Sequence, residues 1–277
     1  MSDKTVCPVC PHHCALSEGA LGRCHARTCR EGRSVSTNYG KITSIALDPI
    51  EKKPLAFFYP GSYVLSVGSY GCNMSCPFCQ NYDIASVGES FFRKLYHLTP
   101  EELVTLASDY IPEGNIGVAY TYNEAMVGYE YVRDCSKLVH EAEMKNVLVT
   151  NGMTELPILE EVLPYIDAMN IDLKGFSQEV YDKLGGDFDT VKRFISRSSE
   201  ESHIELTTLV VPGINDSAND MEREAEWISE ISPDIPLHIT RYFPRYKMME
   251  KPTDIGLMKE LKAVAERHLN RVLLGNV

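Results

Sequence analysis

Two adjoining segments decide the fold: Tyr63-Val64-Leu65-Ser66-Val67, followed a few residues later by Cys72-Asn73-Met74-Ser75-Cys76-Pro77-Phe78-Cys79. The first segment is apolar and partly β-branched, which is typical of a buried strand. Three thiolates in one eight-residue loop predict a metal centre. Their number favours a cubane iron–sulfur cluster, because structural zinc takes four protein ligands, whereas a cubane can take three thiolates and leave one iron open to an exogenous ligand.

Two other interpretations of this loop stay open. A zinc ion could use these cysteines together with a distant fourth one, or the thiols could be free and buried. The chain can wrap a cluster without strain, because each intervening residue spans about 3.5 Å. Gly71, just before the first cysteine, helps the turn.

The spacing CxxxCxxC, with an aromatic residue directly before the last cysteine, resembles the signature of the radical S-adenosylmethionine (SAM) superfamily. The resemblance implies that Cys72, Cys76 and Cys79 hold a 4Fe-4S cluster whose open iron chelates the amino and carboxylate groups of SAM. It also implies that one electron from the reduced cluster cleaves SAM to a 5'-deoxyadenosyl radical. Phe78 would then pack near the adenine.

The composition is that of an ordinary globular protein: 277 residues, 44% hydrophobic and 24% charged. No apolar run approaches the roughly 20 residues of a membrane span, and no secretory signal opens the chain. The net charge of -12 argues against a nucleic-acid surface. Nine cysteines predict metal or redox chemistry rather than disulfides, so we expect a cytoplasmic protein that binds neither nucleic acid nor membrane.

Beyond residue 60, apolar segments alternate with helical patterns, as a parallel βα protein requires. Residues 1–60 lack this rhythm, so we expect a cysteine-rich N-terminal appendage there and the barrel in residues 61–277. The fold class is therefore α/β, a partial (β/α)6 barrel resembling a TIM barrel, which is also the fold of radical SAM enzymes. The expected strands are Val64–Ser69, Ile116–Tyr120, Asn146–Thr150, Ala168–Asp172, Ile204–Val210 and Pro236–Thr240.

Helix signals lie between these strands. Thr99-Pro100-Glu101-Glu102 reads as a capped helix start. A long amphipathic helix is expected over Met126–Lys145, and Asp216 or Ser217 should cap a helix that runs through Ile228.

Polar side chains close several of the expected strands, where functional groups of parallel barrels gather. Thr121-Tyr122-Asn123-Glu124 resembles a variant of the Gly-Gly-Glu type motif of the radical SAM superfamily. Thr150-Asn151-Gly152 and Asp172-Leu173-Lys174 resemble motifs of glycyl-radical activating enzymes. The resemblance implies contacts to SAM, and it extends to His238, while Arg241 and Tyr246 would meet the substrate. The candidate cofactor-binding residues are Phe78, Asn81, Asp83, Asn123, Glu124, Thr150, Asn151, Asp172, Lys174 and His238.

The N-terminal segment supplies a second group of thiols, Cys7, Cys10, Cys14 and Cys24. Four cysteines are enough for a tetrahedral zinc ion or for a second iron–sulfur cluster, and free reduced thiols are the remaining alternative. Cys135 lies among apolar residues of an expected helix and is interpreted as a core residue.

Together with an N-terminal Cys-Pro-Val-Cys-Pro-His-His-Cys run and an Arg-Tyr-Phe-Pro-Arg-Tyr-Lys-Met run, these motifs resemble the radical enzymes of the AmmeMemoRadiSam system, which are related to pyruvate formate-lyase activating enzymes. The leading prediction is a radical SAM enzyme of oxidoreductase type that abstracts hydrogen from an unidentified small molecule or protein. Its electron donor would be a flavodoxin or ferredoxin. The alternatives are an activase for a glycyl-radical enzyme and a metal-binding interaction module without turnover.

Overall fold

The computed structural model describes residues 4–277, and its centre is one eight-stranded sheet. All neighbouring pairs are parallel except the first, in which β6 runs antiparallel to β7. The strands follow the chain in strict order across the sheet: β6 (Ser44–Pro49), β7 (Tyr63–Gly68), β9 (Asn115–Tyr120), β10 (Lys145–Thr150), β11 (Ala168–Asp172), β12 (His203–Val210), β13 (Leu237–Arg241) and β14 (Val272–Gly275).

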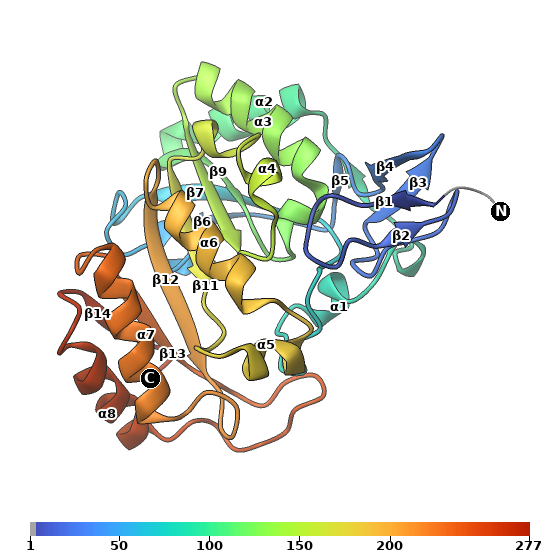
Figure 1. Cartoon of the computed structure of the whole chain (residues 1–277). Helices are drawn as coiled ribbons and strands as arrows, with labels where there is room; N and C mark the ends of the chain where they lie inside the picture. The colour runs from blue at the N-terminus through green and yellow to red at the C-terminus, as the bar shows by residue number, and fades with distance from the viewer. Residues whose placement is uncertain (1–3) are drawn as a thin grey trace.

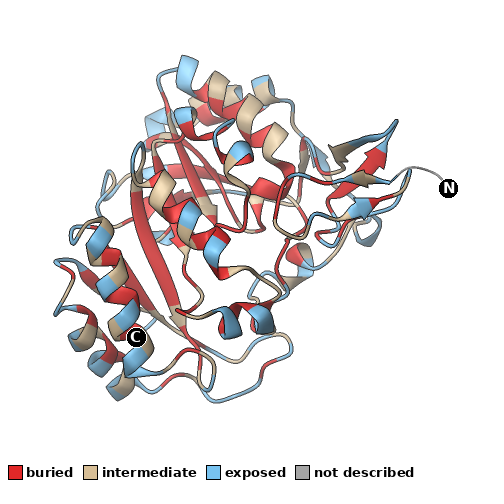
Figure 2. Cartoon of the chain, viewed as in Figure 1, coloured by how far each residue is buried: buried red, intermediate tan, exposed pale blue. Residues whose placement is uncertain are grey.

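Helices cover the outer face of this curved sheet, and their inward faces are the buried ones (Figures 1 and 2). The α-helices are α1 (Tyr82–Ala85), α2 (Pro100–Asp109), α3 (Tyr129–Glu141), α4 (Leu156–Leu159), α5 (Gln178–Leu184), α6 (Phe188–Ser198), α7 (Ala218–Ile231) and α8 (Ile255–Ala265). Short 3-10 turns lie at Ile50–Lys52, Glu89–Phe91, Ile111–Glu113, Ala125–Gly128 and Leu163–Tyr165. The architecture is the expected partial βα barrel.

Two helix starts follow the expected capping chemistry. Thr99 and Glu102 form a reciprocal capping box at α2, with Pro100 in the first turn. Ser217, one of the two expected caps, accepts a hydrogen bond from the backbone N–H of Asp220 and begins α7.

The helix expected over Met126–Lys145 is shorter in the structure than its amphipathic pattern indicates. A 3-10 turn occupies Ala125–Gly128, because the Glu124 carboxylate accepts from the N–H of Met126 and caps that turn. At the other end Glu143 takes a positive φ of 57°, and Lys145 already belongs to strand β10. The expectation of a helix over Met126–Lys145 was therefore wrong at both ends.

The sheet also holds two strands that the sequence pattern did not reveal, β6 and β14. Both lie at sheet edges, where burial is incomplete and the apolar pattern is weak. Because β6 begins at Ser44, the barrel sheet starts inside the range assigned to the appendage. The division of the chain into two domains stays a prediction.

Small two-stranded sheets, built from the segment before the barrel sheet and from one strand that follows β7, lie to one side of the barrel, away from α7, α8 and β14 (Figure 1). Their strands are β1 (Thr5–Val6) with β2 (Ala15–Leu16), β3 (Arg27–Arg30) with β4 (Arg33–Ser36), and β5 (Lys41–Ile42) with β8 (Tyr96–His97).

Arg27 on β3 ties this region to the barrel. Its guanidinium group is buried and makes paired hydrogen bonds of 2.9 and 2.8 Å to both carboxylate oxygens of Glu130 on α3.

Over residues 4–277 no helix is both long enough and apolar enough to cross a membrane.

Candidate active site

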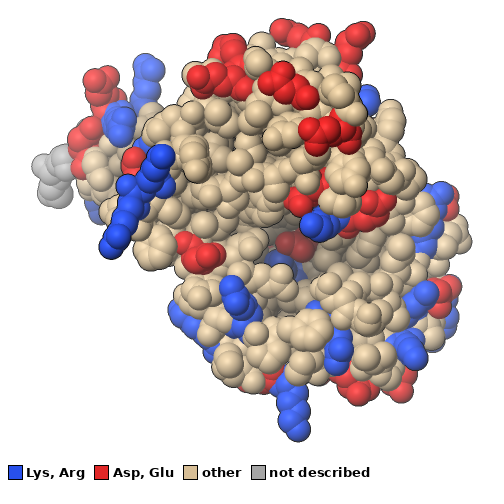
Figure 3. Space-filling model, turned by 180° about the vertical axis from the view of Figure 1, so that it is seen from behind, with Lys and Arg blue, Asp and Glu red and all other residues tan. Residues whose placement is uncertain are grey.

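A cavity of about 760 Å³ opens at the carboxyl ends of the parallel strands. Figure 3 shows a hollow on the face opposite to the view of Figure 1, with acidic and basic side chains inside it. Most of the expected cofactor-binding residues line this one cavity: Cys72, Cys76, Phe78, Cys79, Asn81, Asn123, Glu124, Thr150, Asn151, Asp172, Lys174 and His238.

The loop that carries the three cysteines is held at several points. The N–H of Ser75 donates to the Leu184 carbonyl at 2.8 Å, and the Asn73 amide donates to the Met153 carbonyl at 2.6 Å. Gly71 takes a φ of +91°, and a Cβ added there would lie only 2.5 Å from the carbonyl oxygen of Cys24. Only glycine fits this close approach.

The thiols of the loop are shielded from water. Burial raises the pKa of Cys72 well above its ordinary value and that of Cys76 to about 11. These thiols are therefore protonated at neutral pH, and a bound metal would have to displace their protons. In the part of the chain from residue 4 onward, no three His, Cys, Asp or Glu side chains are arranged to hold a single metal ion.

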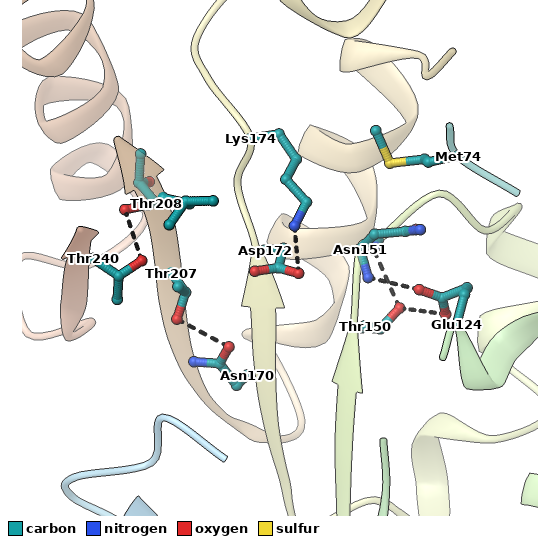
Figure 4. Close-up of polar contacts among 12 residues, drawn as sticks. Met74, Glu124, Thr150, Asn151, Asn170, Asp172, Lys174, Thr207, Thr208 and Thr240 are labelled. Atoms are coloured by element: carbon teal, nitrogen blue, oxygen red, sulfur yellow. Dashed lines mark hydrogen bonds and ion pairs between the residues drawn. The ribbon is translucent and has the colours of Figure 1, made fainter. Parts of the chain in front are cut away.

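Glu124 is the centre of a polar network beside the cysteine loop (Figure 4). One carboxylate oxygen accepts from the Thr150 hydroxyl at 2.8 Å and from the N–H of Met126 at 3.1 Å. The other accepts from the N–H of Asn151 at 2.8 Å. The side chain is 3% exposed, and burial raises its pKa. Glu124 thus joins the ends of β9 and β10.

Two asparagines connect this network to the cysteine loop. The Asn151 amide donates to the side-chain oxygen of Asn73 at 2.9 Å and lies 3.6 Å from the sulfur of Cys72. The Asn123 amide donates to the carbonyls of Tyr70 and Gly71 at 3.2 and 3.1 Å. Asn123 therefore positions the backbone that leads into the cysteine loop while it also lines the cavity.

Lys174 and Asp172 form an ion pair of 2.7 Å at the carboxyl end of β11, and both point into the site (Figure 4). Burial opposes the charge of Lys174, but the negative charge of the adjacent Asp172 carboxylate more than compensates, so the pKa of Lys174 is raised. Lys174 is therefore a fixed cation on the wall of the cavity.

His238 on β13 is held by a carboxylate that sequence reasoning missed, Glu205 on β12. The His238 Nε2 lies 2.6 Å from one Glu205 oxygen, and His203 lies 3.0 Å from the other. Glu205 also accepts the backbone N–H groups of Ala56 and Phe57 at 3.0 and 2.8 Å. Burial disfavours the Glu205 carboxylate, but its four donors outweigh that effect and lower its pKa to about 2.

The signal for Glu205 was present in the sequence. A carboxylate at the second position of the expected strand Ile204–Val210 cannot be buried without partners, so it indicates a polar network.

Among the residues that the structure describes, three expected functional residues do not line the cavity: Asp83, Arg241 and Tyr246. Asp83 belongs to the short helix α1 and does not line it. Arg241 donates through Nε to the Thr253 carbonyl at 2.8 Å, and Tyr246 stacks on Tyr82 with 4.5 Å between ring centroids. The fold gives Arg241 and Tyr246 structural contacts that a motif cannot reveal.

The N-terminal thiols converge as well. Cys7, Cys10, Cys14 and Cys24 line one small second cavity together with His12. Cys7, Cys10 and Cys24 are buried, and Cys14 is partly so. Burial and the neighbouring thiols raise the pKa of Cys10 to about 12.

Cys135 on α3, in contrast, packs in the main core, as expected.

The fold is a partial βα barrel whose candidate active site lies at the carboxyl ends of its strands beside a three-cysteine loop. The family model of the radical SAM superfamily matches residues 66–228. The chain belongs to this superfamily and is related to the activating enzymes of pyruvate formate-lyase.

Two curated proteins and one solved structure show how far the likeness extends. An uncharacterized protein of Methanocaldococcus jannaschii is 37% identical over 99% of this chain and 82% of its own length. The pyruvate formate-lyase 1-activating enzyme of Escherichia coli is 22% identical over 73% of this chain and 88% of its own. A radical SAM methyltransferase from Sphaerobacter thermophilus superposes with a TM-score of 0.59 at 14% identity, covering 78% of this chain and 67% of that one.

Proposed function

We propose that Cys72, Cys76 and Cys79 bind a 4Fe-4S cluster and that the adjoining cavity binds SAM. The observation that carries this proposal is that the three thiols line the same cavity as Glu124, Lys174 and His238, in a chain of the radical SAM superfamily. When bound, the cluster supplies one electron that cleaves the sulfonium of SAM and yields a 5'-deoxyadenosyl radical.

The polar groups of the cavity fit the charges of SAM. Lys174 provides a cation for its carboxylate, and the Glu124 carboxylate and the Thr150 hydroxyl provide acceptors for its ammonium. His238, oriented by Glu205, contributes an imidazole from β13, which lies toward the other edge of the sheet from β9 and β10. These side chains are already fixed by neighbouring strands, so little ordering is needed on binding.

The apolar part of the cavity would exclude water from the radical. Met74 and Phe78 line it from within the cysteine loop, and Leu273 and Leu274 line it from β14. A dry wall prevents quenching of a reactive species by solvent.

Anaerobic reconstitution with iron and sulfide tests this function. After reduction with dithionite, we expect an EPR signal that changes when SAM is added, together with release of 5'-deoxyadenosine. Cys76→Ala should lose both, whereas the matched control Cys135→Ala, which removes a core thiol outside the cavity, should keep both. An unchanged EPR response in Cys76→Ala, or one zinc ion per chain at this loop after strictly anaerobic purification, would contradict the proposal.

The relatives make a protein substrate the second candidate. The named relatives include activating enzymes of pyruvate formate-lyase and of 4-hydroxyphenylacetate decarboxylase. We propose an activase for a glycyl-radical enzyme as this alternative, with a flavodoxin or ferredoxin as the electron donor. A glycyl EPR doublet on a co-purified partner protein would favour it, and consumption of a small molecule without a partner would exclude it.

A further inference from the structure

We propose that Cys7, Cys10, Cys14 and Cys24 bind a second iron–sulfur cluster, fully ligated by protein, that exchanges electrons with the cluster proposed on Cys72, Cys76 and Cys79. The electron exchange rests on the function proposed for the triad Cys72, Cys76 and Cys79, whereas binding of the N-terminal cluster does not. The family model begins at residue 66, so the four N-terminal thiols lie outside it.

The local structure brings the four thiols together from two turns. Cys7, Cys10 and Cys14 belong to the hairpin between β1 and β2, where the N–H of Cys7 donates to the Cys14 carbonyl at 3.0 Å. Cys24 enters from the next turn, where the N–H of Gly22 donates to the Arg27 carbonyl at 2.8 Å. Backbone hydrogen bonds therefore fix the thiols around one cavity.

The arrangement of the described thiols is not that of a zinc site. Over residues 4–277 no three potential ligands are arranged to hold a single ion, and this holds for the N-terminal thiols as it does for the triad. A single zinc ion requires four sulfurs at about 2.3 Å from one point. A cubane places its thiolates around a larger body, so its ligands stand farther apart. Four cysteines also complete a cubane and leave no iron open.

Charge and burial suit such a group. Arg23 and Arg27 line the same cavity as the four cysteines, and Arg27 is ion-paired with Glu130, so Arg23 supplies the positive charge beside the thiolates. The Arg27 guanidinium is 2% exposed, and the sulfur-bearing residues Cys7, Cys10 and Cys24 are each less than a tenth exposed. Burial limits the access of oxygen and water to a bound cluster.

The two groups of cysteines are direct neighbours. The carbonyl of Cys24 approaches Gly71 so closely that an added Cβ would lie 2.5 Å away, and Gly71 is bonded to Cys72. The His12 Nε2 lies 2.8 Å from the Asn73 carbonyl, on the other side of Cys72. Backbone contact and one hydrogen bond thus connect the N-terminal turns to the first cysteine of the triad.

The electron balance is simple. A one-electron flavin or iron–sulfur carrier reduces the N-terminal cluster, which then passes that electron to the cluster of the triad and returns to its oxidised state. Each cleavage of SAM consumes one electron and gives methionine and one 5'-deoxyadenosyl radical. The N-terminal cluster is neither a ligand of SAM nor consumed.

Iron counting tests the second site without relying on activity. The triple variant Cys72→Ala, Cys76→Ala, Cys79→Ala should still bind about four irons per chain after anaerobic reconstitution, and the wild type about eight. The EPR signal of the reduced triple variant should not respond to SAM, because no iron is open. Absence of iron in the triple variant, or one zinc ion per chain in its place, would overturn the proposal.

The reciprocal variant and a control complete this test. Cys10→Ser with Cys14→Ser should retain about four irons and a SAM-responsive signal, and Cys135→Ala should retain about eight. If the reciprocal variant does not fold, the triple variant still decides the question. If the proposed function fails, the wild type gives no SAM-dependent signal while the triple variant still binds iron.

Electron exchange has its own measurement. Wild type reduced at both clusters and freed of reductant should yield about two 5'-deoxyadenosines per chain on addition of SAM, with both EPR signals lost, because one electron is used for each cleavage. A yield of about one, with the SAM-insensitive signal still present, would overturn the exchange. The yield should not vary with protein concentration, since the transfer is within one chain.

Discussion

Side chains at the carboxyl ends of the barrel strands either line the cavity or orient a lining residue through a hydrogen bond. Glu205 illustrates the second task, because it orients His238 without lining the cavity itself. A carboxylate with four donors is fully satisfied and ionised, and the imidazole it holds cannot turn freely. The geometry of the site therefore depends on a residue behind it.

We expect Glu205→Gln to lower the free energy of unfolding at pH 7 by about 1–3 kcal/mol, because an amide cannot accept from all four donors. The pKa of Glu205 is lowered from 4.5 to about 2, so its stabilising contribution is present above pH 4.5 and is lost as the pH falls toward 2. Urea titrations between pH 3 and pH 7 should show a flatter acid decline in the variant.

The control for this prediction is Glu250→Gln, which changes an exposed carboxylate. It should leave both the stability and its pH dependence unchanged. An equally steep acid decline in Glu205→Gln and the wild type would contradict the role given to Glu205.

At the scale of elements, the interface between α7 and β12 contains a carboxyl group with the opposite behaviour. Glu224 on α7 is buried and hydrogen-bonds the Thr208 hydroxyl on β12. Burial raises its pKa from 4.5 to about 8. Unlike Glu205, it has one side-chain hydrogen-bond partner and no ion pair among residues 4–277, so its neutral form is the stable one at pH 7.

We expect the stability of the wild type to fall as the pH rises from about 4.5 to 8, since the folded state keeps a proton on Glu224 that the unfolded chain releases. Glu224→Gln keeps a neutral partner for Thr208 and removes this loss, which amounts to at most about 5 kcal/mol. Thermal denaturation from pH 5 to pH 8.5 should show a flatter profile in Glu224→Gln. Glu226→Gln, exposed on the same helix, should match the wild type; a variant profile as steep as the wild type would refute the prediction.

At the scale of the whole molecule, the N-terminal strands depend on the barrel for their place. Their largest polar anchor is Arg27, whose guanidinium reaches Glu130 and also donates to the Val127 carbonyl at 3.1 Å. Removing the buried Arg27 side chain leaves the partly buried Glu130 carboxylate without its partner and empties the space that the guanidinium fills. The anchor thus holds the N-terminal cysteines beside the triad loop.

Arg27→Ala should lower the free energy of unfolding by about 3–5 kcal/mol and expose residues 4–43 to proteolysis before the barrel. Limited proteolysis with mass mapping of the first cuts measures this effect. Arg30→Ala, an exposed arginine on the same strand, is the matched control and should be cut like the wild type. If Arg27→Ala were cut first within the barrel, the anchor would not be the one described.

The sequence by itself determined the strands and the thiols, because both are local. Six parallel strands were predicted within a few residues, since buried strands are continuous apolar runs, and the cysteine spacing needs no tertiary information. The strand-end motifs also pointed to one cavity, since parallel strands place their carboxyl ends on one edge. Edge strands β6 and β14 were not predicted, because partly buried strands show little periodic apolar pattern. The start of α3 was not predicted correctly, because the Glu124 side chain caps a 3-10 turn that the apolar pattern does not reveal.

Only the tertiary structure decided which residues meet. Glu205 and His238 are 33 positions apart, and His12 and Asn73 are 61 apart, so their hydrogen bonds depend on how strands and loops pack. Packing also placed Arg241 and Tyr246 in structural contacts and brought Cys24 against Gly71. Residue types and spacing fix the chemistry available to a chain, whereas long-range contacts fix which of those groups act together.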